Sequence, residues 1–580
     1  MSDQPSGLGA VARCSLGRNT HIFDGTALNL LHIISGTSYE TAYHSFLILD
    51  CYIEYIAVCH HTVKIKAPGI VMSKVADQSP CSPESSGQGN GGILYRAAAY
   101  ADSPVDSAGK NPDVIRAAAP RRLYDTIFKI KVFYLRVSPI QIPIWINFTE
   151  QAEAVAAIEA AASALPAWSA TPLAKRVELM QKALEIFKTY RDEIIRLEAL
   201  ELGAPVSYSA NAHCDYQFIR IESYIRESQK VVFEEQFEQS TVVRESVGVI
   251  ACITPWNYPL GQVVQKIIPA LLMGNTVVLK PSQHTPLTAY LLVDSLDRAG
   301  FPAGTVNLIT GRGSKLGDTL ATHPLVDMIS FTGSTAVGIK LSQKALEGVK
   351  RISLELGGKS PFIWLPSEDY EPAINQLFGS VFYNSGQTCT ALTRLLVPES
   401  DLEKVKALLL RRIPQLVVGD PMDPKTNIGP MASKAQYDKV LSYIELGQSE
   451  GAELLCGGRA PEAGKGYFIK PTVFVNVTNS MRIAREEIFG PVLCVITYKT
   501  VDEAVAIAND TPYGLNAAVF GERELALSVA KRIKAGNVYV NGGPRDVTAP
   551  FGGYKQSGIG REGGRYGLME FTQLKATFDR

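Results

Sequence analysis

From about position 247 onward, the chain alternates between short apolar runs rich in β-branched residues and longer segments in which apolar residues recur every three or four positions. The first pattern predicts buried strands and the second predicts helices. The expected strands cover 247–253, 276–279, 306–309, 328–331 and 352–354, and the expected helices cover 260–273, 287–299 (closed by Gly300) and a stretch from about Thr335. Apolar strands joined by crossover helices are typical of a parallel sheet with helices on both faces.

A second, shorter series of the same kind begins at 361–364 and continues to 492–497, which predicts a second α/β lobe. Ahead of the first series, an alanine-rich helix is expected over 152–164. The pair Thr171-Pro172 predicts the start of another helix, with the threonine as N-cap and the proline as first helical residue. Apolar residues then keep a helical spacing down to Gly203, so we expect one long amphipathic helix.

Residues 1–119 have a different character. They hold four of the nine cysteines and five of the eight histidines, and they show neither a helical nor a strand period. The segment 79–92 is rich in serine, glycine and proline, a composition that cannot bury enough apolar surface to offset its loss of conformational entropy. We therefore expect an atypical, poorly ordered N-terminal extension.

Charge and cysteine content exclude several classes of protein. The 580 residues include 57 Lys+Arg and 57 Asp+Glu, so the chain lacks the excess positive charge that drives nucleic-acid binding. Nine scattered cysteines provide neither a disulfide scaffold nor a metal-binding spacing. The most apolar early window, 46–58, contains two acidic residues and is too short to cross a bilayer. With no secretory signal evident, we expect a cytoplasmic protein that binds no nucleic acid, membrane or metal.

Residues whose side chains can bind a ligand or take part in catalysis follow the expected strands. Parallel sheets bind ligands at the carboxyl ends of their strands, where this chain reads 254–259 (Thr-Pro-Trp-Asn-Tyr-Pro), 280–283 (Lys-Pro-Ser-Gln), 311–313 (Gly-Arg-Gly), 332–338 (Thr-Gly-Ser-Thr-Ala-Val-Gly) and 355–359 (Glu-Leu-Gly-Gly-Lys). Each segment alone is a weak signal. Their succession after consecutive strands indicates a crevice for a dinucleotide, with a helix N-terminus suited to phosphate.

Cys389 ends the turn-forming segment Asn384-Ser-Gly-Gln-Thr-Cys389. A thiol that attacks a carbonyl carbon needs hydrogen-bond donors for the oxyanion and a group that manages protons. Asn257 and Glu355 offer these functions from the ends of two expected strands. The combination distinguishes Cys389 from an ordinary buried cysteine.

These segments together resemble the aldehyde dehydrogenase superfamily from about Thr149 to the C-terminus. The shared motifs are Pro255-Trp-Asn257, Lys280-Pro-Ser282, Phe331-Thr-Gly-Ser-Thr335, Glu355-Leu-Gly-Gly-Lys359, Gly386-Gln-Thr-Cys389, Glu487-Ile-Phe-Gly-Pro491 and Pro550-Phe-Gly-Gly-Tyr-Lys-Gln-Ser-Gly558. The resemblance implies a dinucleotide-binding domain over 120–357, a catalytic domain over 358–545 and a bridging or oligomerisation segment over 546–580. It also implies an active site between the two lobes, and a homodimer or homotetramer.

The resemblance assigns roles residue by residue. Cys389 matches the nucleophile, Glu355 the general base and Asn257 the oxyanion donor, with Lys266 and Glu562 as a proton relay behind Glu355. Residues matching cofactor contacts are Thr254, Pro255, Trp256, Lys280, Ser282, Gln283, Gly313, Gly333, Ser334, Leu356, Gln436, Lys439, Glu487 and Phe489. The substrate entrance is expected at Tyr258, Gln265, Thr388 and Thr390.

The implied reaction is oxidation of an aldehyde to a carboxylic acid with NAD, through a thiohemiacetal and a thioester on Cys389. NADP is a possible cofactor because Gln283 stands where NAD-preferring members commonly carry glutamate. Two alternatives remain open: a CoA-acylating semialdehyde dehydrogenase, which Glu355 argues against, and a catalytically silent relative with a binding or structural role.

Overall fold

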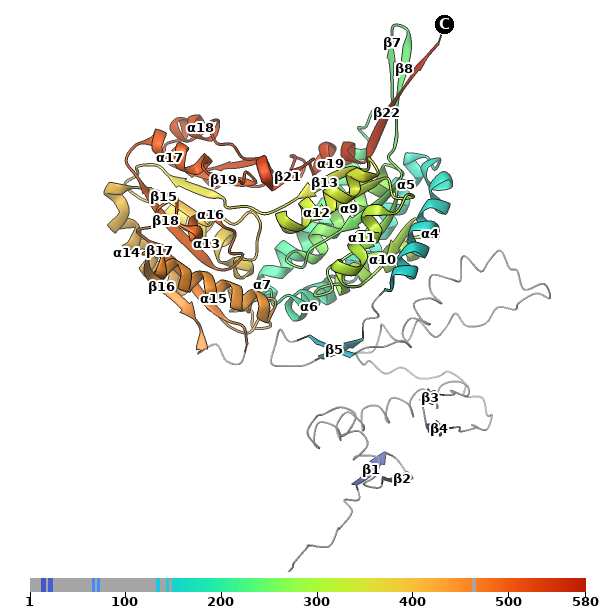
Figure 1. Ribbon diagram of the computed structural model, residues 1–580, viewed down its shortest axis with the longest axis horizontal. Coiled ribbons are helices and arrows are strands. Elements are labelled where there is room, and N and C mark those ends of the chain that lie inside the picture. Colours follow the sequence, from blue (N-terminus) through green and yellow to red (C-terminus); the bar gives the residue numbers. More distant parts are fainter. Residues whose placement is uncertain are drawn as a thin grey trace, which may run out of the picture. The chain divides into compact units, whose positions relative to one another are not determined.

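The computed structural model describes residues 149–461 and 466–579, together with the backbone of three short antiparallel strand pairs nearer the N-terminus (Figure 1). The pairs are β1 (Ala12–Leu16) with β2 (Asn19–Phe23), β3 (Ile65–Ala67) with β4 (Ile70–Met72), and β5 (Val132–Leu135) with β6 (Ile142–Trp145). The chain divides into two units, Met1–Val105 and Asp106–Arg580. The expected low order of residues 1–119 concerns a stretch that, apart from four of these strands, lies outside the described residues.

The first lobe contains a six-stranded sheet in the order β11-β10-β9-β12-β13-β21. Its strands are β9 (Val249–Ile253), β10 (Thr276–Lys280), β11 (Val306–Leu308), β12 (Met328–Thr332), β13 (Arg351–Glu355) and β21 (Gly558–Ile559). The first five are parallel, which confirms the fold class expected from the sequence. The short edge strand β21 is antiparallel and comes from near the C-terminus.

Helices cover both faces of this sheet. They are α4 (Gln151–Ser169), α5 (Leu173–Lys188), α6 (Arg191–Glu201), α8 (Tyr216–Ser228), α9 (Pro259–Leu272), α10 (Leu287–Ala299), α11 (Gly313–Thr322) and α12 (Thr335–Glu347). In β9, Ile250 and Cys252 pack into the core with α5, α8, α9 and α10, whereas Val249 and Ala251 pack into a second core with α4 and α11. Two buried faces explain why the strand is apolar throughout.

The prediction of one long helix is wrong, because the structure has two helices, α5 and α6, separated at Thr189-Tyr190. Tyr190 leaves the helical conformation (φ −91°, ψ 7°), and its hydroxyl donates a hydrogen bond to Asp294 of α10 at 2.7 Å. A tertiary contact therefore sets the break. Thr171 was also expected to cap α5, but its hydroxyl donates to the Ala167 carbonyl of the preceding helix.

The second lobe contains a seven-stranded sheet in the order β16-β17-β18-β15-β14-β19-β20. Its strands are β14 (Pro361–Trp364), β15 (Arg394–Pro398), β16 (Glu453–Arg459), β17 (Ile469–Val475), β18 (Val492–Tyr498), β19 (Asn516–Phe520) and β20 (Asn537–Val540). Only β16 runs antiparallel to its neighbour in this sheet. The helices of this lobe are α13 (Glu371–Val381), α14 (Leu402–Arg412), α15 (Lys434–Ser449), α16 (Arg482–Arg485), α17 (Val501–Asn509) and α18 (Arg523–Ala530).

A third, antiparallel sheet stands apart from the two lobes in Figure 1 and contains β7 (Glu234–Phe237), β8 (Ser240–Ser246) and β22 (Thr572–Phe578). Just before β22 in the chain is α19 (Gly564–Glu570). The hydrophobic pattern did not single out β7 and β8. Among the described residues, no helix combines the length and apolarity that a membrane span requires.

Candidate active site

The loop that carries Cys389 follows a tight left-handed turn. Asn384 and Ser385 both have positive φ angles, of 54° and 56°, and Gly386 continues the run at 69°. A Cβ atom at Gly386 would lie 2.2 Å from the Gly490 carbonyl group, so only glycine fits at this close approach. The turn therefore fixes the path of the chain as it enters the Cys389 loop.

Hydrogen bonds tie this loop to the segment after β9. The Asn384 side-chain amide donates to the Asn257 carbonyl at 2.9 Å, and the Asn257 amide Nδ2 donates to the Gln387 carbonyl at 3.0 Å. Asn257 is 3% exposed. One of its two N–H groups is used in this contact, which leaves the other for an oxyanion beside Cys389.

Burial raises the pKa of the Cys389 thiol to about 12, with further contributions from the negative charges of Glu487 and Glu355. The thiol is therefore protonated at neutral pH in this arrangement. Deprotonation needs either a base or a nearby positive charge. Glu355 is the carboxylate that the sequence assigned to proton transfer.

Replacing Glu487 with glutamine is expected to shift the alkylation of Cys389 by iodoacetamide to lower pH. The substitution removes a negative charge that raises the pKa of the thiol, so more thiolate is present at each pH below that pKa. The measurement is the pseudo-first-order alkylation rate as a function of pH. Glu486→Gln is the matched control, because Glu486 is bound by Arg482 and is not among the charges that act on Cys389. Identical profiles for wild type and Glu487→Gln would show that the charge of Glu487 does not raise the pKa of Cys389.

Glu355 ends β13 and is 3% exposed. Among the described residues, neither of its carboxylate oxygens has a hydrogen-bond partner. Burial raises its pKa well above the ordinary value, and the charge of Glu562 adds to the rise. A Cβ atom at Gly552 would lie 2.7 Å from Glu355 Oε1, so this glycine leaves room for the carboxylate.

Lys266 and Glu562 form a buried ion pair behind Glu355. The Lys266 ammonium donates to Glu562 Oε1 at 2.7 Å and to the Ser330 hydroxyl at 3.2 Å, and the two charged side chains are 0% and 3% exposed. The charges of both residues act on the pKa of Glu355. The structure therefore brings the two expected relay residues together close to Glu355, and it adds Ser330, which the motifs did not indicate.

Several expected cofactor residues present unpaired polar atoms at the strand ends. Thr254 Oγ1 follows β9 and Gln283 Oε1 follows β10, and both are buried without a hydrogen-bond partner among the described residues. Gly313 begins α11, where a Cβ atom would lie 3.9 Å from Lys280 Cε. Burial lowers the pKa of Lys280 to about 8. Polar groups at the carboxyl ends of parallel strands are suited to bind a polar ligand.

The N-terminus of α12 lies at the same edge of the sheet. Ser334 is the N-cap of this 13-residue helix, and its side chain makes no capping hydrogen bond. The hydroxyl and the first N–H groups of the helix are therefore suited to a phosphate group. Gly333 immediately precedes the cap. The backbone N–H of Leu356, the residue after β13, donates to the Ser557 carbonyl at 2.9 Å.

A second group of expected cofactor residues surrounds Glu487. Glu487 Oε1 accepts a hydrogen bond from the Gly358 N–H at 3.0 Å, and the Phe489 ring makes an edge contact with Trp256 at 5.4 Å between centroids. The remaining residues of the set, Pro255 and Ser282, follow β9 and β10. Both lobes contribute to this group.

Gln436 and Lys439 hold the backbone of the Glu487 segment. The Gln436 amide donates to the Phe489 carbonyl at 2.8 Å, and the Lys439 ammonium donates to the Glu487 carbonyl at 3.0 Å. Both side chains come from α15. The structure thus gives them a positioning contact within the chain, and their direct contact with a cofactor stays a prediction.

A chain of hydroxyl groups lies beside the expected substrate entrance. The Tyr258 hydroxyl lies 3.1 Å from Thr388 Oγ1 and 2.8 Å from the Tyr208 hydroxyl. Tyr208 was not expected from the sequence, because it lies in the short helix α7 (Val206–Ser209), about 50 residues before the motif. Gln265 Oε1 is buried without a partner among the described residues, and the Thr390 carbonyl accepts from Asn516.

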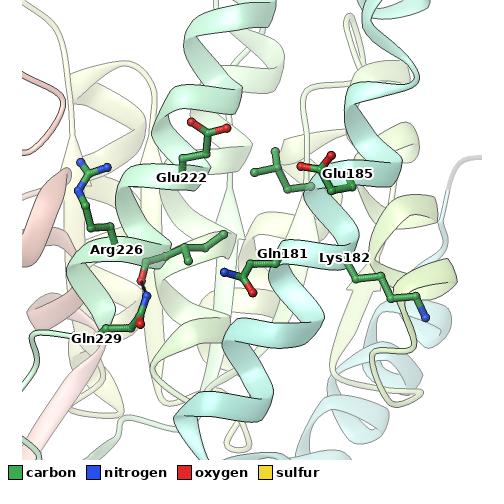
Figure 2. A pocket seen from close by; sticks show the side chains of 8 residues that line it. Gln181, Lys182, Glu185, Glu222, Arg226 and Gln229 are labelled. Atoms are coloured by element: carbon green, nitrogen blue, oxygen red, sulfur yellow. Dashed lines mark hydrogen bonds between the residues drawn. The ribbon is translucent and has the colours of Figure 1, made fainter.

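A surface hollow between α5 and α8 lies apart from these groups (Figure 2). It is lined by Gln181, Lys182, Leu184, Glu185, Glu222, Ile225, Arg226 and Gln229. None of the expected site residues is among them. The acidic residues Glu185 and Glu222 both pair with Lys188, whose single positive charge offsets one of their two negative charges.

Comparisons with known proteins identify relatives of the whole catalytic region. The family model described as the aldehyde dehydrogenase family matches residues 139–577. The chain is 46% identical to a 3-succinoylsemialdehyde-pyridine dehydrogenase from a Pseudomonas species over 428 residues, which cover 72% of this chain and 89% of that protein.

Solved structures show the same similarity. Aldehyde dehydrogenase C from Pseudomonas syringae, a mutant solved with NAD+ and octanal, gives a TM-score of 0.76 at 41% identity, over 77% of this chain and 93% of its own. An aldehyde dehydrogenase from Mycobacterium tuberculosis, solved with NAD+, gives a TM-score of 0.75 at 38% identity, over 78% of this chain and 95% of its own.

Proposed function

The chain belongs to the aldehyde dehydrogenase family and oxidises aldehydes, and from this premise we propose that Cys389, Glu355 and Asn257 form its catalytic centre and release a carboxylic acid. The main support is the hydrogen-bonded connection between Asn257 and the Cys389 loop, next to a buried carboxylate without a partner. This arrangement joins a nucleophile, an oxyanion donor and a base.

NAD+ fits the residues that surround the strand ends. The unpaired Thr254 and Gln283 oxygens suit polar groups of a nucleotide, and the uncapped N-terminus of α12 suits its pyrophosphate. Glu487 would face the nicotinamide side, with Gln436 and Lys439 fixing its backbone. Bound NAD+ supplies the acceptor for the hydride that leaves the substrate.

In the first half-reaction, the Cys389 thiol gives its proton to a water molecule, and the sulfur forms a bond to the aldehyde carbon. The carbonyl π electrons move to the oxygen, which the free N–H of Asn257 and the Cys389 backbone N–H stabilise. When the oxyanion re-forms the carbonyl, the C–H bond breaks with loss of hydride. The product of this step is a thioester on Cys389.

In the second half-reaction, Glu355 accepts a proton from water, and the resulting hydroxide adds to the thioester carbon. The C–S bond then breaks, which releases the carboxylic acid and regenerates Cys389. A raised pKa makes the Glu355 carboxylate a stronger base, as this role requires. The Lys266–Glu562 pair provides a route by which the accepted proton can move away from Glu355.

The reaction is tested by incubating the purified protein with NAD+ and a panel of aliphatic and aromatic aldehydes while reduced cofactor is followed by absorbance. We expect turnover with water as the only acyl acceptor. Turnover that requires coenzyme A would instead support an acylating enzyme. No turnover with any aldehyde, despite measurable NAD+ binding, would support a catalytically silent relative.

Replacing Gln283 with glutamate is expected to increase the preference for NAD+ over NADP+ at least tenfold. Gln283 lacks the negative charge that would repel the 2′-phosphate of NADP, and Lys280 is near enough along the chain to pair with that phosphate. We expect the wild-type preference for NAD+ to be smaller than about a hundredfold, or roughly 2.7 kcal/mol.

The measurement is kcat/KM for both cofactors in wild type and in Gln283→Glu. Gln229→Glu, at the hollow between α5 and α8, adds the same charge elsewhere and should leave the ratio unchanged. Strict use of NAD+ by the wild type, with no change in the variant, would show that Gln283 does not face the ribose.

We further propose that 120–357 binds the dinucleotide, that 358–545 is the catalytic domain and that 546–580 contributes to bridging in a homodimer or homotetramer. Exposed apolar side chains on the third sheet support an interface there: Phe237, Leu574 and Phe578 are 57%, 62% and 78% exposed. The five cysteines in the described residues are all free, which supports a reducing location such as the cytoplasm.

A further inference from the structure

Two arginines without a carboxylate partner among the described residues lie close to segments of the proposed catalytic centre. Arg220, from α8, is held by Gln217 Oε1 at 2.7 Å, and its guanidinium lies 4.8 Å from the centroid of the Tyr216 ring. A Cβ atom at Gly261 would lie 3.4 Å from Arg220 Nη1. Gly261 lies in the first turn of α9, which begins two residues after Asn257, so Arg220 contacts the start of the helix that follows the proposed oxyanion donor.

Arg545 approaches from the segment after β20. Its guanidinium lies 4.5 Å from the centroid of the Phe551 ring. Phe551 exchanges backbone hydrogen bonds with the relay residue Glu562, at 2.6 and 2.7 Å, and is followed by Gly552, which packs against the Glu355 carboxylate. Arg545 is therefore connected to the catalytic centre through two residues that border it.

The electrostatic effects of Arg545 place its charge near both the reacting groups and Arg220. Burial raises the pKa values of Cys389 and Glu355, and the positive charge of Arg545 opposes both shifts. Burial, together with the like charge of Arg545, lowers the pKa of Arg220 to about 10. The charges of Arg220 and Arg545 therefore act on each other, and that of Arg545 also acts on Cys389 and Glu355.

Within the described residues, no ion pair compensates either charge. Arg220 is bound by a neutral amide and Arg545 by an aromatic face. The neighbouring Asp546 carboxylate instead accepts two hydrogen bonds from Thr548. The Tyr216 hydroxyl, below the Arg220 guanidinium, is buried without a hydrogen-bond partner. Guanidinium groups that influence each other's charge and lack a carboxylate partner in the protein are suited to bind a carboxylate of a ligand.

We propose that Arg220 and Arg545 bind a carboxylate at the far end of the substrate, so that the enzyme prefers ω-oxo carboxylic acids over unsubstituted aldehydes. This inference rests on the proposed function, because it requires the aldehyde group to react at Cys389. Gly261 is only four residues from Asn257 along the chain, so the acids to test are short ones, of about four to six carbons.

The test compares kcat/KM for each unbranched ω-oxo acid of four to six carbons with that for the unsubstituted aldehyde of the same length. In the wild type, the acid should be favoured at least tenfold. In Arg220→Gln and in Arg545→Gln, this ratio should fall at least tenfold, chiefly through a higher KM for the acid. The ratio is the readout, because loss of the Arg545 charge also affects Cys389 and changes the rate with both substrates.

Arg523→Gln is the matched control, since it removes an exposed arginine of α18 and should leave the ratio unchanged. Thermal melting and NAD+ binding identify any variant that fails to fold, and the other arginine variant then decides the result. For the wild type, KM for the oxo acid should also rise with ionic strength, whereas KM for the plain aldehyde should not.

Equal kcat/KM values for the acid and the plain aldehyde in the wild type, or a ratio unchanged in both folded arginine variants, would overturn the carboxylate site and leave aldehyde oxidation established. Failure of every aldehyde to react would instead overturn the proposed function, and the carboxylate site with it.

Discussion

Replacing Cys389 with alanine is expected to lower kcat for aldehyde oxidation by about 10⁴-fold or more, because the thioester route requires the sulfur. Cofactor binding should be largely retained, since the NAD+-facing residues belong to other segments. The measurement is the rate of NADH formation together with the Kd for NAD+ from fluorescence titration.

Cys456→Ala is the matched control for this prediction. Cys456 is a free, partly exposed thiol of β16, outside the proposed catalytic centre, and its loss should leave turnover unchanged. If Cys389→Ala kept most of the wild-type rate, the nucleophile would have to be another group.

Replacing Glu355 with glutamine is expected to slow hydrolysis of the thioester at least about a hundredfold, while hydride loss is affected much less. The glutamine keeps the size of the side chain but cannot accept a proton from water. Rapid mixing with NAD+ and aldehyde should therefore give a burst of NADH, close to one equivalent per active site, followed by slow turnover.

The burst itself is the internal control, because it shows that the variant binds both substrates and completes the first half-reaction. An equal loss in the burst rate and in steady-state turnover would count against Glu355 as the hydrolytic base and would favour a role in activating Cys389.

The sequence predicted the elements with strong local signals. The helix α10 was expected over 287–299 and lies at Leu287–Ala299, because Gly300 adopts the left-handed conformation that ends it (φ 98°). By contrast, nothing local marks the break at Tyr190, which depends on Asp294 about 100 residues away. β8 is mostly polar and only half-buried, and it pairs with β22 more than 300 residues later, so its pattern gave no clear period.

In the candidate site, too, the sequence predicted residues in local motifs but not residues positioned by distant contacts. The motifs located Cys389, Glu355 and Asn257, because each follows a strand or a turn of recognisable composition. They did not indicate Arg220, Arg545 or Tyr208, whose positions depend on the packing of separate elements. Even the charge state of Cys389 required the structure, since the carboxylates that raise its pKa belong to two other segments.

The central claim is that oxidation proceeds through an acyl group on Cys389. It is tested most directly by mixing Glu355→Gln with NAD+ and an aldehyde, quenching in acid and determining the mass of the protein and of its proteolytic peptides. The account predicts a mass increase equal to that of the aldehyde minus two hydrogen atoms, located on the peptide that contains Cys389. NADH formation without this adduct, or an adduct on Cys456 or another cysteine in its place, would contradict it.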